Sequence, residues 1–242
     1  MNNSIPSNQI LNKENQENIF VDKQTGFDNH SGTVLWNKNC VLENRLAKIT
    51  KRIFDILFTL LAFFLILCWL IPLLALFIKL SSRGPVFFIQ MRTGYKNKPF
   101  MCIKFRSMMV NDKADLQHAI KNDDRVTAIG YFLRKFSLDE LPQFINVLLG
   151  QMSIVGPRPL MLKHTQENAS QMKSFMDRHN VKPGITGLSQ IKGYRGEMFD
   201  KRMLMNRLRF DLFYLSKWSL MLDIFIIYKS INLMLFGDEK AY

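Results

Sequence analysis

The sequence predicts a compact α/β domain, mainly α, that rests on a membrane surface. Three features of the 242-residue chain support this fold class: a long apolar run without charge, a following segment of mixed polarity with frequent Gly and Pro, and a final apolar segment that contains charged residues. We therefore divide the chain into a polar tail at 1–45, a membrane anchor at 46–80 and a main domain at 81–242.

The composition limits the classes of partner. With 48% hydrophobic residues the chain can bury one sizeable core, and its net charge of +13 predicts an anionic partner. Nucleic acid fits worst, because the twenty Phe residues mostly lie in apolar runs instead of alternating with basic residues. We expect no nucleic-acid partner. Cys40, Cys68 and Cys102 are too few and too widely spaced to predict a disulfide framework or a zinc site.

The first 45 residues are rich in Asn, Gln, Lys and Asp, which predicts a mobile tail. This tail does not resemble a secretory signal, because the first apolar run begins only after residue 52.

The run at 56–78 contains no charged residue and is long enough to cross a hydrocarbon core of about 30 Å as a helix. Pro72 lies inside it and is expected to bend the helix. Asp55, just before the run, would lie near the headgroups and pair with Arg52 or cap the helix. Basic residues flank both ends, which favours the cytoplasmic side for each; they are Arg45, Lys48, Lys51 and Arg52 before the run, and Lys79 and Arg83 after it. A re-entrant helix broken at Pro72 satisfies these observations, and a kinked spanning helix is the alternative.

Beyond the anchor, the short apolar runs at 86–89 and 100–105 lie between turn signals and predict a domain with few strands. The apolar segment at 218–236 is interrupted by Asp223 and Lys229, which is typical of an amphipathic helix in the membrane interface.

The densest group of chemically capable residues surrounds Asp139 and Glu140. Apolar residues follow them at helical spacing and predict a helix with one buried face; they are Leu141, Phe144, Ile145, Leu148 and Leu149. Ser137 and Glu140 have capping-box spacing, but we prefer Asp139 as N-cap, with Pro142 in the first turn where its missing N–H is harmless.

Two adjacent carboxylates at a helix start can be simple caps, or they can gather a divalent cation or phosphate. Cations in Gly- and Pro-punctuated stretches lie close to them in sequence: Arg106, Arg125, Arg134, Lys135 and Arg158. Carboxylates beside such cations suit phosphoryl transfer, although a solvated basic surface has the same composition. The sequence contains no Walker loop.

At these residues the chain resembles the bacterial sugar transferases, which are monotopic polyprenol-phosphate phosphoglycosyl transferases. The resemblance covers residues 51 to about 230, and seven stretches carry it in order: Lys51-Arg-Ile-Phe-Asp55, Gly84-Pro-Val-Phe-Phe-Ile-Gln90 with Arg92 and Gly94, Lys104-Phe-Arg-Ser-Met108, Asp124-Arg-Val-Thr127, Asp139-Glu-Leu-Pro-Gln143, Gly156-Pro-Arg-Pro159 and Pro183-Gly-Ile-Thr-Gly187 with Gln190.

The resemblance implies transfer of a sugar 1-phosphate from a UDP-sugar to polyprenol (undecaprenyl) phosphate, with release of UMP. This would be the first membrane step of exopolysaccharide, lipopolysaccharide or other glycoconjugate synthesis. By the same resemblance Asp139 is the nucleophile that forms a covalent phosphosugar, Glu140 is its partner carboxylate, and Mg²⁺ bridges Asp139 and the diphosphate.

The resemblance also implies phosphate contacts for Arg134 and Arg158. Lys104, Arg106 and Arg125 are weaker candidates for substrate contacts, since a structural salt bridge explains Lys104 or Arg106 equally well. Gln190 is a further candidate contact, beside a tight turn.

The expected location is the bacterial inner (cytoplasmic) membrane, with the catalytic domain on its cytoplasmic face and membrane lipids as partners. A homo-oligomer is left open. The rival hypothesis is a non-enzymatic membrane-anchored adaptor with a basic cytoplasmic domain, in which Asp139 and Glu140 only cap a helix. A glycosyltransferase that releases UDP is the rival within the enzymes.

Overall fold

The computed structural model describes residues 40–110, 123–172, 174–195 and 201–236, together with the backbone of two short paired strands, β1 (Phe27–Asp28) and β2 (Thr33–Val34). The rest of the predicted tail lies outside the described residues. Packing is evident from Cys40 onward, because Cys40 and Leu42, beside the short 3₁₀ helix η1 (Val41–Glu43), are buried in the main core.

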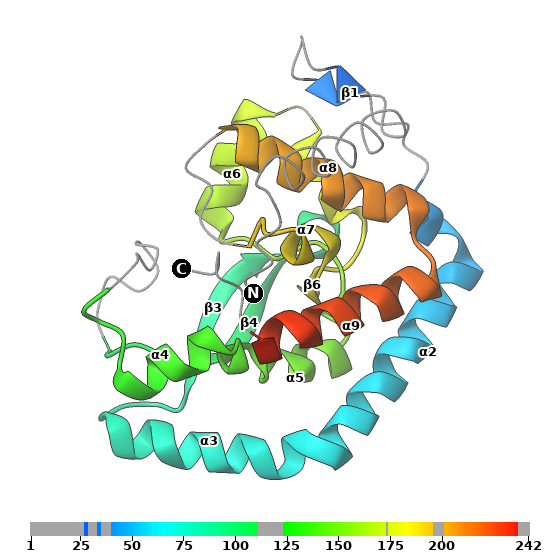
Figure 1. The fold of residues 1–242 in the computed structure, drawn as a ribbon. Coiled ribbons are helices and arrows are strands. Elements are labelled where there is room, and N and C mark those ends of the chain that lie inside the picture. Colours follow the sequence, from blue (N-terminus) through cyan, green and yellow to red (C-terminus); the bar gives the residue numbers. More distant parts are fainter. Residues whose placement is uncertain are drawn as a thin grey trace, which may run out of the picture.

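The anchor is a long bent helix. It begins as α2 (Arg45–Ala62), passes through a π-helical turn, η2 (Phe63–Leu67), and continues as α3 (Cys68–Ser81). Figure 1 shows α2 and α3 running in clearly different directions. Pro72 lies within α3, so the irregular turn precedes the proline and the helix does not end there. A π-turn is a common cause of such a bend, because it breaks the regular i→i−4 hydrogen bonds.

The whole helix is long and apolar enough to cross a membrane, by length and composition, and only 17% of its most apolar window is buried inside the protein. Its first turns, in contrast, are tied to the main domain. Lys51 Nζ donates to Asp223 Oδ2 at 2.7 Å, and Arg52 donates to the carbonyls of Val147 and Leu148. These two flanking cations therefore serve internal contacts in addition to any role at the membrane surface.

The prediction for Asp55 was wrong. Its side chain is buried and accepts hydrogen bonds from Ser153 Oγ and the Ile154 backbone N–H, instead of lying at the headgroups or pairing with Arg52. These partners lie about a hundred residues away in sequence, so local reasoning had no access to them.

Two small sheets support the site, which agrees with the predicted α/β class with few strands. β3 (Phe87–Thr93) pairs antiparallel with β4 (Pro99–Phe105), through the tight turn η3 (Tyr95–Asn97). β5 (Ser153–Val155) pairs in parallel with β6 (Gly184–Thr186). Helices surround both sheets (Figure 1); they are α4 (Ala128–Lys135), η4 (Leu138–Glu140), α5 (Gln143–Leu148), α6 (Leu162–Gln171), η5 (Phe175–Asn180), α7 (Leu188–Ile191), α8 (Lys201–Lys217) and α9 (Leu220–Phe236).

The main core lies between β4, β5, α8 and α9. The predicted C-terminal helix is present as α9, but it also serves this core, because Ile226 and Asp223 are fully buried. Asp223 accepts from Lys51, from Tyr214 OH at 2.8 Å and from Trp218 Nε1 at 3.0 Å. Apolar residues on the remaining face of α9 are exposed, among them Met221, Phe225, Tyr228 and Leu235.

The predicted buried face of the helix after Glu140 is present only in part. Leu141 and Phe144 are partly buried and pack against the hydrophobic cores, but Ile145 and Leu148, with Leu149 just beyond, are exposed. The buried residues of α5 are Gln143, Asn146 and Val147. Asn146 can be buried because its amide accepts from the Ile103 N–H and donates to the Met101 carbonyl on β4. Polar residues thus occupy part of the inner face, and part of the apolar set is turned outward.

Candidate active site

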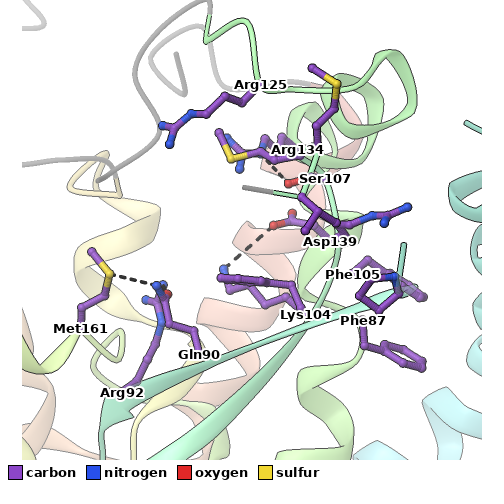
Figure 2. Close-up of a pocket in the computed structure, with 16 residues that line it drawn as sticks. Phe87, Gln90, Arg92, Lys104, Phe105, Ser107, Arg125, Arg134, Asp139 and Met161 are labelled. Carbon is purple, nitrogen blue, oxygen red and sulfur yellow. Dashed lines mark hydrogen bonds and ion pairs between the residues drawn. The ribbon is translucent and has the colours of Figure 1, made fainter. Parts of the chain in front are cut away.

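A pocket of about 290 Å³ opens between β3, β4 and the segment that carries α4 and η4 (Figure 2). Asp139 lies in its wall, and cations surround it. The lining residues include Gln90, Arg92, Lys104, Arg106, Ser107, Arg125, Arg134, Asp139 and Met161.

The local fold of η4 brings Asp139 and Glu140 to this place. Ser137 adopts a left-handed backbone conformation, with φ of 54°, which ends the preceding helix and redirects the chain into η4. The predicted helix start was wrong. Asp139 lies within a 3₁₀ turn, Ser137 makes no side-chain cap, and Pro142 is the N-cap of α5. The two carboxylates are therefore not helix caps, which removes the simplest structural explanation for them.

Glu140 is buried and its carboxylate is saturated with charged donors. Lys104 Nζ lies 2.8 Å from Oε1, and Arg158 donates from Nη2 to Oε1 at 2.7 Å and from Nη1 to Oε2 at 3.2 Å. Although burial raises the pKa of Glu140, the charges of Arg158 and Lys104 hold that pKa well below its usual range. Glu140 is thus a permanent anion that positions two cations.

Asp139 has the opposite environment. It accepts no hydrogen bond from the described residues, and its nearest cation is Lys104, whose Nζ lies 4.0 Å from Oδ2. Burial raises the pKa of Asp139, Lys104 lowers it, and the like charge of Glu140 raises it again, with a net increase. An unbonded carboxylate that faces a pocket is available to react with a ligand.

Among the predicted cations, Arg134 and Arg125 join Asp139 in the pocket wall. Arg134 Nε donates to Ser107 Oγ at 2.8 Å, and Arg125 forms an ion pair with Asp123 at 2.6 Å. Arg106 also lines the pocket, but its guanidinium donates to the carbonyls of Ser82 and Arg83. Its main role is therefore to fasten the end of the anchor to β4.

Gln190 is placed apart from these residues. It is buried in α7, where its amide donates to the Ile185 carbonyl at 3.3 Å, and it does not line the pocket. Its contact with substrate stays a prediction.

The family model for the bacterial sugar transferases matches residues 46–237 of the chain. The chain belongs to the bacterial sugar transferase family. One relative is the UDP-glucose:undecaprenyl-phosphate glucose-1-phosphate transferase of Klebsiella pneumoniae, 47% identical over 78% of this chain and 40% of the relative. The protein of the same name from Caulobacter vibrioides is 38% identical over 79% of this chain and 72% of the relative.

A third relative is the UDP-N-acetylgalactosamine-undecaprenyl-phosphate N-acetylgalactosaminephosphotransferase of Aeromonas hydrophila, 42% identical over 67% of this chain and 38% of the relative. The chain thus spans about 40% of the length of several relatives that it matches.

In this member of the bacterial sugar transferase family, the sequence predicted no role for Arg92, although this residue belongs to one of the motifs that carry the resemblance. Arg92 lines the pocket, and its guanidinium donates to the Pro159 carbonyl and to Gln90 Oε1, so it joins β3 to the segment that carries Arg158. Ser107 was missed as well; it orients Arg134. Arg92 and Ser107 could have been noticed because they lie in or beside the motifs that carry the resemblance. Their hydrogen-bond partners, however, lie far away in sequence.

The donors in the pocket suit a magnesium ion that also binds substrate. Within the described ranges no group of three or more His, Cys, Asp or Glu side chains could hold a metal. Asp139 alone offers an unbonded carboxylate beside the pocket. Mg²⁺ in phosphoryl-transfer sites is commonly held by one or two carboxylates, with substrate phosphates and water as the other ligands, so a single aspartate fits that chemistry.

Proposed function

We propose that this chain transfers a sugar 1-phosphate from a UDP-sugar to polyprenol phosphate and releases UMP, through a covalent intermediate on Asp139. The observation that carries the proposal is the unbonded carboxylate of Asp139 in a pocket lined by Lys104 and Arg134. The names of the relatives supply the substrate class, since they are transferases of UDP-activated sugars to undecaprenyl phosphate.

In the first step a carboxylate oxygen of Asp139 forms a bond to the β-phosphorus of the UDP-sugar. The bond from that phosphorus to the oxygen bridging the two phosphates breaks, and the electron pair leaves with UMP. In the second step an oxygen of polyprenol phosphate attacks the same phosphorus, the bond to Asp139 breaks, and the carboxylate is restored. Neither step requires a proton on the leaving group, because UMP and the carboxylate both leave as anions.

The surrounding cations stabilise the negative charge that gathers on the transferred phosphoryl group. Lys104 lies between the two carboxylates, at 2.8 Å from Glu140 and 4.0 Å from Asp139. Arg134 lies in the pocket wall with Asp139. Glu140 is fully engaged by Lys104 and Arg158, so we assign it the role of fixing these cations, not of transferring a proton.

Mg²⁺, when bound by Asp139 and the substrate diphosphate, would neutralise charge and so make attack by one anion on another feasible. Arg134 and Lys104 add fixed positive charge to the same pocket.

We further propose that the apolar outer faces of α3, α5 and α9 rest in the cytoplasmic leaflet of the inner membrane. Their exposed residues include Trp69, Leu76, Leu148, Phe225 and Leu235. The bend at η2, with basic residues before and after the apolar run, favours a re-entrant anchor over a spanning one. Cysteines introduced at Leu46 and Leu80, with Cys68 replaced by Ser, test this topology. Labelling from the cytoplasmic side at both positions supports the re-entrant anchor, and labelling from opposite sides contradicts it.

The reaction is tested by nucleotide release from the purified chain in nanodiscs, with Mg²⁺, polyprenol phosphate and a panel of UDP-sugars. We expect UMP release with one class of sugar, dependent on the lipid acceptor at steady state and absent in Asp139→Asn. Release of UDP would identify a glycosyltransferase instead. No release from folded protein across the panel would favour the adaptor hypothesis.

A further inference from the structure

Helix α8 carries a buried arginine that the proposed mechanism does not use. Arg207 is only 4% exposed, and within the described ranges its Nε and Nη2 groups have no hydrogen-bond partner. Buried guanidinium N–H groups are ordinarily paired, because an unpaired one loses its hydration without compensation. Arg207 therefore needs a partner that the polypeptide described here does not supply.

The two unpaired groups define the shape of that partner. Nε and Nη2 lie on the same edge of the planar guanidinium, so their N–H bonds point in nearly the same direction. This edge binds two oxygens of a phosphate or a carboxylate at once. Arg178, one of the cations near Arg207, uses the same edge to contact a carboxylate. Its Nε lies 3.0 Å and its Nη2 2.7 Å from Asp211 Oδ2.

No nearby carboxylate is available to Arg207 in the part of the chain that the structure describes. Asp211, the carboxylate with the largest effect on its charge, already accepts from Arg178 and from Ser189 Oγ at 2.7 Å. The positively charged neighbours with the largest effects are Arg178, Arg158 and Arg92. Burial and these like charges lower the pKa of Arg207 to about 9, so the side chain still carries its charge at neutral pH.

The same neighbourhood contains further unsatisfied donors. Arg178 Nη1 and Arg92 Nε are also buried without a partner among the described residues. Arg92 connects this group to the site, because it lines the pocket beside Asp139 and acts on the charge of Arg207. Arg207 and Arg178 do not line the pocket themselves, so Arg92 is the member of this group through which its positive charge and unsatisfied donors adjoin the site.

We propose that Arg207 binds a phosphate group of a substrate through its Nε–Nη2 edge, and that Arg92 and Arg178 contribute positive charge to this subsite. The inference rests on the proposed function and extends it, since it places a second phosphate contact away from Lys104 and Arg134. The diphosphate of the UDP-sugar and the phosphate of polyprenol phosphate share this chemistry, and the experiment separates them.

The test uses the full chain in nanodiscs and compares Arg207→Met with Arg209→Met. Arg209 lies on the same helix and donates to Asn206 Oδ1, so it controls for loss of a buried arginine from α8. Three quantities are measured: the melting temperature without ligand, its increase with inorganic pyrophosphate, and the KM for each substrate in UMP release.

Arg207→Met is expected to melt at the same or a higher temperature than wild type without ligand, because it removes an unpaired buried charge. The pyrophosphate concentration that gives half of the maximal stabilisation should rise at least tenfold in this variant. A change of this size is usual when a hydrogen bond to a charged group is lost. A matching rise in KM for the UDP-sugar assigns the subsite to the diphosphate, and a rise for polyprenol phosphate alone assigns it to the acceptor. Arg209→Met should leave the pyrophosphate response and both KM values near wild type.

A purely structural role for Arg207 would give the opposite result: a lower melting temperature with an unchanged pyrophosphate response. That outcome overturns the inference, even if UMP release is normal. If wild type releases no UMP but pyrophosphate stabilises it and not Arg207→Met, the proposed function fails and the phosphate subsite stands. Arg207→Lys keeps the charge and loses the two-donor edge, so it decides the question if the Met variant does not fold; a tenfold weaker response supports the subsite, and a wild-type response overturns it.

Discussion

Arg158 donates two hydrogen bonds to the carboxylate of Glu140, at 2.7 and 3.2 Å, while the carboxylate of the preceding residue, Asp139, accepts none from the described residues. Two adjacent acidic residues therefore lie in distinct environments. Glu140 holds Arg158 and Lys104 in place, and Asp139 faces the pocket, as the proposed nucleophile must. This division depends on a short 3₁₀ turn, which directs successive side chains toward different partners.

The pH dependence of UMP release should report the ionisation of Asp139. Because its pKa is raised, the acidic limb of the profile should lie at higher pH than for an ordinary aspartate, with activity lost as the pH falls through the raised pKa. Lys104 lowers that pKa, so Lys104→Met should move the limb to higher pH and slow the reaction. A pH–rate series for both proteins measures the shift.

Glu140→Gln should shift the acidic limb in the direction opposite to Lys104→Met. Glu140 raises the pKa of Asp139 by like charge, so removing its charge should move the acidic limb to lower pH, even though the rate falls. If both variants shift the limb in the same direction, Asp139 is not the group that titrates.

Gly130 on α4 should tolerate no side chain. A Cβ at this position would lie 1.8 Å from the Ser107 carbonyl oxygen, and Ser107 also accepts the hydrogen bond of Arg134. Gly130→Ala should therefore displace either α4 or the backbone at Ser107. The free energy of unfolding should fall by about 1–3 kcal/mol, as at other overpacked sites. The melting temperature and the rate of UMP release should both decline. Gly193→Asn is the control, since nothing lies within 4 Å of that position and Asn tolerates its positive φ.

Lys51 and Asp223 should stabilise the junction of the anchor with α9. Lys51→Met leaves Asp223 with Tyr214 and Trp218 as donors, whereas Asp223→Asn leaves a buried ammonium without its anion. Asp223→Asn should cost about 3–5 kcal/mol, and the double variant should recover part of that loss. Thermal or denaturant unfolding of wild type, the two single variants and the double variant gives the coupling free energy between Lys51 and Asp223. If the losses in the single variants simply add up to the loss in the double variant, the two residues do not interact.

His179 should make the protein sensitive to mild acid. Burial and the charge of Arg178 lower its pKa to about 3, so the folded protein binds no proton there while the unfolded chain does below pH 6.5. The unfolded state then binds more protons, and stability should fall by roughly 1.4 kcal/mol per pH unit between 6.5 and 3 from this group alone.

His179→Gln keeps a partner for Asn97 Oδ1, which accepts from His179 in the folded protein when Nδ1 carries the proton. The variant should be less sensitive to acid than wild type in denaturant titrations at pH 7 and pH 5. An unchanged difference between the two pH values would mean that His179 is protonated in the folded state.

Local sequence signals predicted the parts of this protein that local physics determines. The uncharged run gave the long anchor helix, and the short apolar runs between turn signals gave β3 and β4. Charge density along the chain pointed to Asp139 with Arg125 and Arg134, and the family resemblance added Lys104; all four line the pocket.

Two of the errors share one cause, which is that the deciding contact is distant in sequence. Asp55 was assigned to the membrane surface, but Ser153 and Ile154 bind it in the core. The apolar face of α5 was assigned to the interior, but Asn146 takes part of that place by satisfying two backbone groups on β4, and Ile145 and Leu148 are exposed. Arg207 gave no signal at all, since an unpaired guanidinium can be recognised only when its surroundings are known.

The most direct test of the central claim is to ask whether the sugar phosphate remains on Asp139. The protein is mixed with Mg²⁺ and the UDP-sugar found in the panel, labelled at the β-phosphate, without polyprenol phosphate, and quenched before analysis of the intact chain and its peptides. We expect close to one label per active protein on the peptide that contains Asp139, one equivalent of UMP, loss of the label when polyprenol phosphate is added, and no label in Asp139→Asn. Lipid-linked product formed by wild type with no labelled protein at any time, or a label that persists in Asp139→Asn, would contradict it.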